Sequence, residues 1–286
     1  MVKQIETLVE DIYAIFNNPK EYDLELFNRF GANLTEIMTA RFSEERKGGT
    51  LRLSNIGKPD RQLWFEVNDP GGGEALSPQS LIKFMYGDMQ EQLCILLAKL
   101  AGHEVEYEQE EVFVNGIKGH IDCTIDGNLV DVKSASRFAF SKFKDGTLLE
   151  PGNDAFGYVG QLAAYVHAKK PGTDGYILAV NKDLGHLALL KVPKERLAEY
   201  DVEARIDHDK VMVTQPVWPE QCYDVVPDGK SGNMKLDTGC SYCKHKFTCF
   251  PNVKTFYYSG GPRYLTHIVK EPKVPDFPPI DIGEPI

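Results

Sequence analysis

The sequence predicts an α/β protein, in the broad sense that includes α+β, with helices flanking a central mixed sheet. Segments with helical periodicity alternate along the chain with short apolar segments of strand character. This order is typical of a mixed sheet with helices packed against it. The 286 residues, 42% hydrophobic and 26% charged, have an ordinary globular composition and suit one large domain.

The N-terminal part is predicted to be helical. Residues 4–17 place apolar side chains at helical spacing, which predicts a first helix. A second helix is expected over 33–45, with Asn33 as its cap. Residues 54–66 indicate a short turn that leads into an aromatic-bearing helix, and 68–78 form a loop because they are rich in Gly and Pro.

The middle of the chain carries the strongest periodic signals. Residues 79–102 predict a long helix, with an apolar stripe from Met85 through Met89 and Leu93 to Leu100 and with Gly102 at its end. The remaining elements follow in order: strands over 104–114, 119–126 and 129–133, a helix over 157–169, a hairpin of strands 175–182 and 186–193, and a helix over 194–212.

Three segments are expected within one compact domain. They are a helical region over 1–78, a core over 79–215, and a cysteine-containing segment over 216–286. The residues after 250 are rich in proline and are expected to be extended or mobile.

Charge and hydropathy limit the function classes. The net charge of −10 argues against a protein that coats nucleic acid non-specifically, but it permits an enzyme that uses metal ions and a local basic strip. No window approaches the roughly 18 apolar residues of a membrane span, and the N-terminus is acidic and periodic. We therefore expect a cytoplasmic protein that does not act in a membrane.

Two aspartates and a lysine interrupt an apolar stretch, Gly119 to Ser134, "GHIDCTIDGNLVDVKS". If the chain turns at Gly127, Asp122 approaches Asp131 and Lys133, which share one face of their strand. These charges either face water or converge on a magnesium ion, with Glu91 as a third carboxylate. The apolar neighbours favour convergence, because buried Asp and Lys are rare unless they are paired or bind metal.

The motif order resembles the PD-(D/E)XK nucleases. Glu91, the Gly119-x-x-Asp122 motif, the triplet Asp131-Val132-Lys133 and the Gln161-x-x-x-Tyr165 motif follow in that order. More narrowly they resemble the RecB-like branch, which includes phage exonucleases and CRISPR-associated RecB-like exonucleases. The resemblance covers about residues 80–250 and implies a restriction-endonuclease-like core.

The resemblance implies a role for each of these residues. Asp122 and Asp131 would hold Mg²⁺ or Mn²⁺ together with the Val132 carbonyl, and Glu91 would also reach the metal. Lys133 would help to activate water and stabilise the charge that develops on phosphorus. Two further residues on one helical face, Gln161 and Tyr165, would support the site and contact DNA.

Three cysteines crowd together in "CSYCKHKFTC", namely Cys240, Cys243 and Cys249. Thiols at this spacing suit zinc or an iron–sulfur cluster. The spacing resembles the end of a four-cysteine iron–sulfur staple found in several RecB-like nucleases, whose first cysteine lies upstream of the core. Here no cysteine precedes Cys94, which suits an apolar helix core. Either Cys222, His245 or another group completes a metal site, or the thiols are free.

Two other segments have both a binding and a packing interpretation. Arg61, with Gln62 and Trp64, either follows a DNA strand or belongs to a helix that packs its apolar residues inward. Residues 137–144 interleave basic and aromatic side chains, and are expected to be an exposed loop that either guides DNA or covers its Phe residues.

Together these observations predict a metal-dependent deoxyribonuclease with DNA as its partner. By resemblance, an exonuclease acting on linear DNA is favoured over an endonuclease, of a phage type used in replication, recombination or degradation in the host cytoplasm. The alternatives are a CRISPR-adaptation-type nuclease and a non-catalytic DNA-binding protein that kept the fold. A homo-oligomer, or association with replication or recombination proteins, is also possible in this fold.

Overall fold

The structure is a computed structural model that describes residues 3–17, 21–43 and 49–277. Within it the chain divides into two compact units. The first comprises Met1–Lys58 and Ser77–Val211, and the second comprises Pro59–Leu76 and Met212–Ile286. Each unit is therefore assembled from two separate stretches of the chain.

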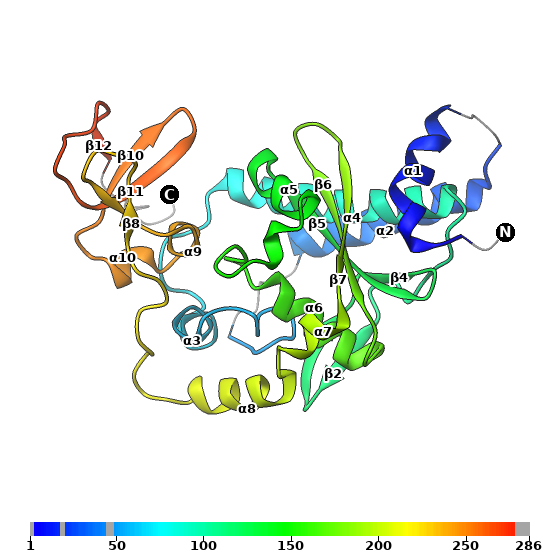
Figure 1. Ribbon diagram of the computed structural model, residues 1–286, viewed down its shortest axis with the longest axis horizontal. Coiled ribbons are helices and arrows are strands. Elements are labelled where there is room, and N and C mark those ends of the chain that lie inside the picture. Colours follow the sequence, from blue (N-terminus) through cyan, green and yellow to red (C-terminus); the bar gives the residue numbers. More distant parts are fainter. Residues whose placement is uncertain (1–2, 18–20, 44–48, 278–286) are drawn as a thin grey trace. The chain divides into compact units, whose positions relative to one another are not determined.

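The first unit is built on a mixed sheet with the strand order β1-β4-β5-β6-β7 (Figure 1). Strands β5 and β6 pair in parallel, whereas the other neighbours are antiparallel. Helices cover both faces, so the predicted class, a mixed sheet flanked by helices with a helical N-terminal region, is confirmed. The strands are β1 (Val105–Glu106), β4 (Cys123–Ile125), β5 (Asn128–Ala135), β6 (Gly175–Asn181) and β7 (Leu187–Val192).

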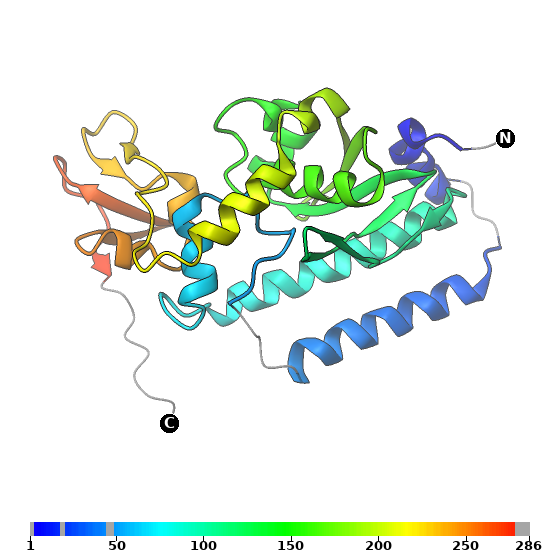
Figure 2. The ribbon, with the colours of Figure 1, turned by 90° about the horizontal axis from the view of Figure 1, so that it is seen from below.

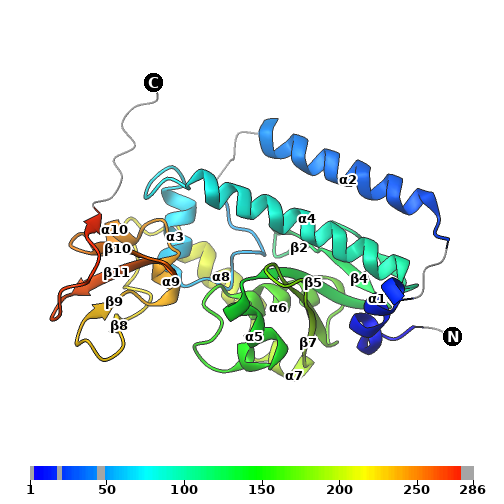
Figure 3. The same ribbon diagram turned by 90° about the horizontal axis from the view of Figure 1, so that it is seen from above.

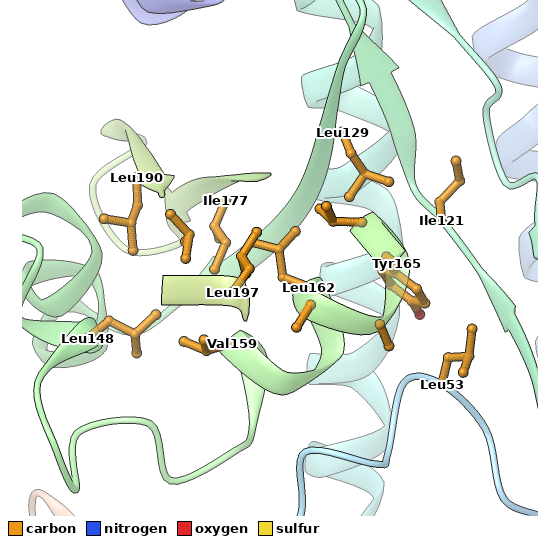
Figure 4. Packing of buried hydrophobic residues seen from close by; sticks show 14 of the residues in the cluster. Leu53, Ile121, Leu129, Leu148, Val159, Leu162, Tyr165, Ile177, Leu190 and Leu197 are labelled. Carbon is orange, nitrogen blue, oxygen red and sulfur yellow. The ribbon is translucent and has the colours of Figure 1, made fainter. Parts of the chain in front are cut away.

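Alternation along β5 divides the core of this unit into two clusters. Leu129 and Ala135 belong to the cluster that also contains residues of α6 (Tyr158–Lys169), and Figure 4 shows part of this packing. Val130 and Val132 belong to the other cluster, which contains residues of α1 (Leu8–Asn17) and α4 (Pro78–Leu100). Because β5 is covered on both faces, it is a central strand, and a charged side chain on it is removed from solvent.

The N-terminal helices differ from the prediction at one boundary. A 3₁₀ turn, η1 (Ile5–Thr7), and α1 match the expected helix over 4–17. The second helix, α2, spans Leu24–Ser43 and runs beside α4 (Figures 2 and 3). Asp23 accepts the Glu25 N–H at its start, so the expected cap at Asn33 is wrong. Asn33 instead donates to the Gln92 side chain from mid-helix, and residues 44–45 of that prediction lie outside the described residues.

The predicted apolar stripe of α4 is only partly buried. Leu96 and Leu100 are buried, but Met89 and Leu93 are 44% and 43% exposed. The buried side of the helix also includes residues outside the predicted stripe, namely Gln92, Cys94, Ile95 and Ala98. Because the helix is apolar around much of its circumference, periodicity alone did not identify the face that meets the sheet.

Several predicted elements are divided by local backbone geometry. The segment 104–114 contains β1 and β2 (Glu111–Val114), separated where Tyr107 and Gln109 adopt positive φ. The segment 119–126 contains the end of β3 (Ile117–His120) and all of β4. The predicted turn at Gly127 is present as the β4–β5 hairpin, and β6 and β7 form the predicted second hairpin.

Two further predictions change in helix content. The segment 194–212 forms two helices, α7 (Lys194–Ala198) and α8 (Val202–Met212), because the Asp201 carboxylate accepts the Ala204 N–H and starts a new helix. The segment 137–144, expected as a loop, is a helix, α5 (Arg137–Lys144), capped by Ser136. Its burial pattern is helical, with Phe140 and Phe143 inside.

The second unit contains an antiparallel sheet with the order β12-β10-β11-β9-β8. Three of these strands, β10, β11 and β12, lie after residue 250, so the described part of that segment has extended backbone that is paired in a sheet. None of the helices described here has the length and apolar content that a bilayer crossing requires. The elements are α3 (Asp60–Asn68), β8 (Val226–Pro227), β9 (Met234–Lys235), α9 (Thr238–Ser241), α10 (Lys246–Cys249), β10 (Lys254–Tyr258), β11 (Gly261–His267) and β12 (Asp276–Phe277).

Candidate metal-dependent active site

The candidate site lies where β4 separates from β5. The two strands pair from Ile125↔Asn128 to Cys123↔Val130, and the pairing ends there. Beyond that point the Val132 N–H donates to the Asp122 carboxylate at 2.6 Å in place of a strand carbonyl. This hydrogen bond anchors Asp122 beside β5, although Asp122 itself lies between β3 and β4.

Asp131 and Lys133 form a buried ion pair on one face of β5. The Lys133 Nζ lies 2.7 Å from Asp131 Oδ2, and the Asp131 side chain is 0% exposed. The other oxygen, Oδ1, is buried and has no hydrogen-bond partner within the described part of the chain. An unpartnered buried carboxylate oxygen is costly unless a ligand satisfies it.

Glu91 reaches the same place from α4. Burial raises its pKa to about 7, with further increases from the charges of Asp131 and Asp88 and a decrease from Lys133. The Gln109 side-chain amide donates to Glu91 Oε1 at 2.6 Å. Glu91 on α4, Asp122 between β3 and β4, and the pair Asp131–Lys133 on β5 therefore lie within electrostatic reach of one another.

The cluster carries more negative than positive charge, and this excess changes the pKa values of its members. Burial, then the charges of Asp131 and Glu91, raise the pKa of Asp122 well above its usual range. Burial also raises the pKa of Asp131. For Lys133 burial acts to lower the pKa, but the neighbouring aspartates more than offset it, and the net direction is upward.

This donor set fits a hard divalent cation. The cluster contains three carboxylates and a single ammonium, so one positive charge does not balance the site when all are ionised. Oxygen donors at close range are the ligands that Mg²⁺ and Mn²⁺ take. A cation bound here would also remove the like-charge repulsion that raises the pKa of Asp122.

Gln161 and Tyr165 lie on one face of α6, as the spacing predicts. The Gln161 amide donates to the Tyr165 hydroxyl at 3.1 Å. Burial, then the charge of Asp131, raises the pKa of Tyr165, which places its phenol within electrostatic reach of the cluster. Figure 4 shows Tyr165 pointing from α6 toward Leu53. A Cβ added at Gly119 would lie only 2.9 Å from Tyr165 Cε1 and 2.8 Å from Leu53 Cβ, so the motif glycine allows this close packing.

Gln109 is a residue that the sequence did not single out. Its backbone N–H donates to the Asp122 carbonyl at 3.1 Å, while its side chain holds Glu91. It has φ of +54°, a left-handed conformation that is uncommon for Gln. Residues in such conformations concentrate at functional sites. No pattern in the sequence marks it, because its contacts depend on the path of the chain between β1 and β2.

Arg61 belongs to the second unit, in α3. Its Nε donates to the Pro219 carbonyl at 2.6 Å, and its Nη1 lies 3.7 Å from Cys249 Sγ. Leu63 is fully buried, and the Trp64 Nε1 donates to the Gln215 carbonyl. The helix with inward apolar residues is therefore present, but the Arg61 guanidinium is engaged with protein groups.

A pocket in the second unit is lined by four cysteines. Cys222 joins Cys240, Cys243 and Cys249 there, together with Arg61. Burial raises the pKa of Cys240 to about 12, and the charges of the other three thiols, Cys222 first, add to it. Cys94 is separate and 2% exposed within α4, as expected for a core residue.

Cys222 lies at the N-terminus of α3. Burial raises the pKa of its thiol, while hydrogen bonds from the backbone N–H groups of Gln62 and Arg61 act to lower it. The first N–H groups of a helix have no partner within the helix, so they are free to bind a thiolate. Four soft thiol donors around one pocket fit zinc or an iron–sulfur cluster.

Comparisons with known proteins give distant structural likenesses. No family model and no curated protein matches the sequence. Among solved structures, "Crystal structure of SSO0001" is similar with a TM-score of 0.41 and 15% identity, over 79% of this chain and 96% of that chain. "Crystal Structure of LHK-Exo in complex with dAMP" is similar with a TM-score of 0.35 and 12% identity, over 56% and 92%. At these values neither likeness identifies this chain.

Proposed function

We propose that this chain is a metal-dependent deoxyribonuclease of the PD-(D/E)XK superfamily, RecB-like branch, that hydrolyses phosphodiester bonds. The convergence of Glu91, Asp122, Asp131 and Lys133 at the separation of β4 from β5 supports this function most strongly. Buried charges at such a density destabilise a fold, and perturbed carboxylates of this kind cluster at catalytic sites.

Each residue has a role in the proposed chemistry. Asp122 and Asp131 hold Mg²⁺ or Mn²⁺, with Glu91 and the Val132 carbonyl as further ligands. The cation, when bound, neutralises charge on the phosphodiester and lowers the pKa of water. Lys133, oriented by its ion pair with Asp131, presents its ammonium to the phosphate and stabilises the negative charge that develops there.

The remaining assignments concern the substrate. Gln161 and Tyr165 support the aspartates from α6 and contact DNA. We propose digestion of linear DNA from an end, as in the exonucleases that the motifs resemble, rather than cutting within a strand. A CRISPR-adaptation-type nuclease would use the same residues, and a non-catalytic DNA-binding protein would keep the fold alone.

The test uses end-labelled linear duplex, linear single-stranded DNA and covalently closed circular DNA, with Mg²⁺ or with a chelator. Asp131→Asn and Lys133→Met are compared with the wild type, and Glu106→Gln, an exposed carboxylate on β1, is the matched control. Circular dichroism establishes that each variant is folded.

The proposal expects Mg²⁺-dependent loss of linear DNA in the wild type and in Glu106→Gln, and at least a hundredfold slower loss in the other two variants, about 3 kcal/mol of transition-state stabilisation. Cutting of the circle would make the protein an endonuclease. Binding without cleavage would favour the non-catalytic alternative. Undiminished cleavage by folded Asp131→Asn would refute the site.

We also propose that Cys222, Cys240, Cys243 and Cys249 bind an iron–sulfur cluster or zinc. The pocket that all four line supports this assignment. Such a group would tie α3 to the C-terminal segment within the second unit and stabilise it. The proposal does not depend on nuclease activity.

Elemental analysis after anaerobic preparation tests the thiol site, with Cys222→Ser as the variant and Cys94→Ala as the control. Iron with labile sulfide, or zinc alone, in the wild type and in Cys94→Ala identifies the group, and Cys222→Ser is expected to lose it. Absence of both metals from the wild type would remove the proposal.

A further inference from the structure

Two aromatic side chains lie next to the candidate active site. The Lys133 Nζ, paired with Asp131, lies 5.5 Å from the centroid of the Tyr158 ring. The Phe156 ring lies 5.6 Å from the Tyr158 ring, and the two planes are inclined by 36°. Phe156 is 39% exposed. Two neighbouring rings therefore lead from solvent to the ammonium that the proposed chemistry uses.

The segment that carries these rings is held in place by hydrogen bonds. The Asp154 carboxylate accepts the backbone N–H groups of Tyr158, at 2.9 Å, and of Val159, at 2.8 Å. The Asn153 carbonyl accepts the Lys142 ammonium at 2.9 Å, and the Asn153 amide donates to the Thr147 carbonyl at 2.7 Å. A partly exposed Phe at the end of a well-bonded loop is preorganised for binding, because little freedom is lost when a ligand arrives.

The adjoining helix α5 supplies positive charge. It carries three basic residues, Arg137, Lys142 and Lys144, and no acidic residue, in a chain whose net charge is −10. Arg137 and Lys144 are exposed, and Lys142 connects α5 to the aromatic segment through Asn153. Phe138, 78% exposed, lies 5.8 Å from the Lys142 ammonium. Basic and aromatic groups side by side match the backbone and bases of a nucleic acid strand.

We propose that Phe156 and Tyr158 form a stacking surface for single-stranded DNA, with its phosphates along the basic side chains of α5. A strand bound this way brings a phosphodiester to Lys133, and this part of the inference rests on the proposed nuclease function. Single-stranded DNA is the substrate class, because bases within a duplex are already stacked on both faces and cannot lie on a protein ring.

Binding is measured without cleavage, by fluorescence anisotropy of a labelled short oligothymidylate in the presence of chelator. The variants are Phe156→Leu and Tyr158→Leu, which remove the rings but keep apolar volume, and Phe156→Tyr, which restores a ring. Phe113→Leu is the matched control, since Phe113 is 57% exposed on β2. Each Leu variant at the surface is expected to weaken binding by about 5- to 100-fold, as the loss of one stacked base does. Phe156→Tyr and Phe113→Leu are expected to bind like the wild type.

Oligothymidylate affinity that is unchanged in both folded Leu variants would overturn the inference, as would equal effects on single-stranded and duplex DNA. Steady-state cleavage kinetics with Mg²⁺ test the proposed nuclease function separately from the stacking surface. A raised KM with unchanged kcat in Phe156→Leu supports both proposals. Loss of oligothymidylate binding in a protein that cleaves nothing supports the stacking surface and refutes the nuclease. Cleavage with unaltered KM refutes the stacking surface alone.

Discussion

The pKa of Glu91 makes a measurable prediction about the metal-free protein. Its carboxyl titrates at about 7 in the folded chain, against an ordinary value of 4.5. In the unfolded chain the Glu91 carboxyl loses its proton near pH 4.5, whereas in the folded chain it keeps the proton up to about pH 7. The stability that the protonated Glu91 carboxyl contributes to the fold is therefore fully present below about pH 4.5. This contribution is lost as pH rises through about 7. The difference of about 2.5 units corresponds to roughly 3 kcal/mol.

Glu91→Gln removes this titration and keeps the oxygen that accepts from Gln109. Without metal, the variant is expected to match the wild type near pH 4 and to exceed its free energy of unfolding by roughly 3 kcal/mol near pH 8. Urea unfolding followed by far-ultraviolet circular dichroism, at several pH values in chelator, measures the difference. Glu106→Gln, exposed on β1, is the control and is expected to follow the wild type.

Divalent metal should reverse this order. Mg²⁺ binds the ionised carboxylates, so its stabilisation of the wild type is expected to grow as pH rises and to be smaller in Glu91→Gln. Parallel pH profiles for the wild type and Glu91→Gln in chelator would refute the assignment of Glu91 to a buried, negatively charged cluster. A larger effect of Mg²⁺ on the variant than on the wild type would contradict its role as a ligand.

Three further predictions concern the framework of the site. Gly57→Ala would place Cβ 2.2 Å from the carbonyl oxygen of Gly157, so thermal unfolding is expected to show a loss of about 3 kcal/mol or more, whereas Gly31→Ala, in open space within α2, should add about 0.5–1 kcal/mol. Asp154→Ala removes two hydrogen bonds at the start of α6 and should cost about 1–2 kcal/mol in urea unfolding; an unchanged midpoint would contradict the capping. Gln109→Ala should weaken Mg²⁺ binding in calorimetry by about tenfold, and equal affinity would show that it does not position the α4 carboxylate.

Local pattern was sufficient for the strands at the centre of the fold. Alternation placed Asp131 and Lys133 on one face, and the ion pair between them is the result. The turn at Gly127 was readable because its backbone adopts positive φ, which glycine accepts readily. These features depend on residues only a few positions apart, whose geometry the backbone itself determines.

The sequence predicted that the long helices exist, but not where α2 begins or which face of α4 is buried. The chain from 24 to 43 is one helix, yet its cap lies at Asp23 rather than Asn33, because either residue can cap and the packing against α4 decides between them. The exposed Met89 and Leu93 of α4 are a similar case. Where a helix is apolar on more than one side, the neighbouring elements select the buried face.

By itself, the sequence determined the fold class, the shared face of Asp131 and Lys133, and the clustering of Cys240, Cys243 and Cys249. Only the tertiary structure decided that Glu91 and Gln109 meet the aspartates and that Cys222 joins the other thiols. The physical reason is range. Backbone geometry relates residues that are near in sequence, whereas contacts between distant segments depend on how strands separate, how loops run and which faces pack.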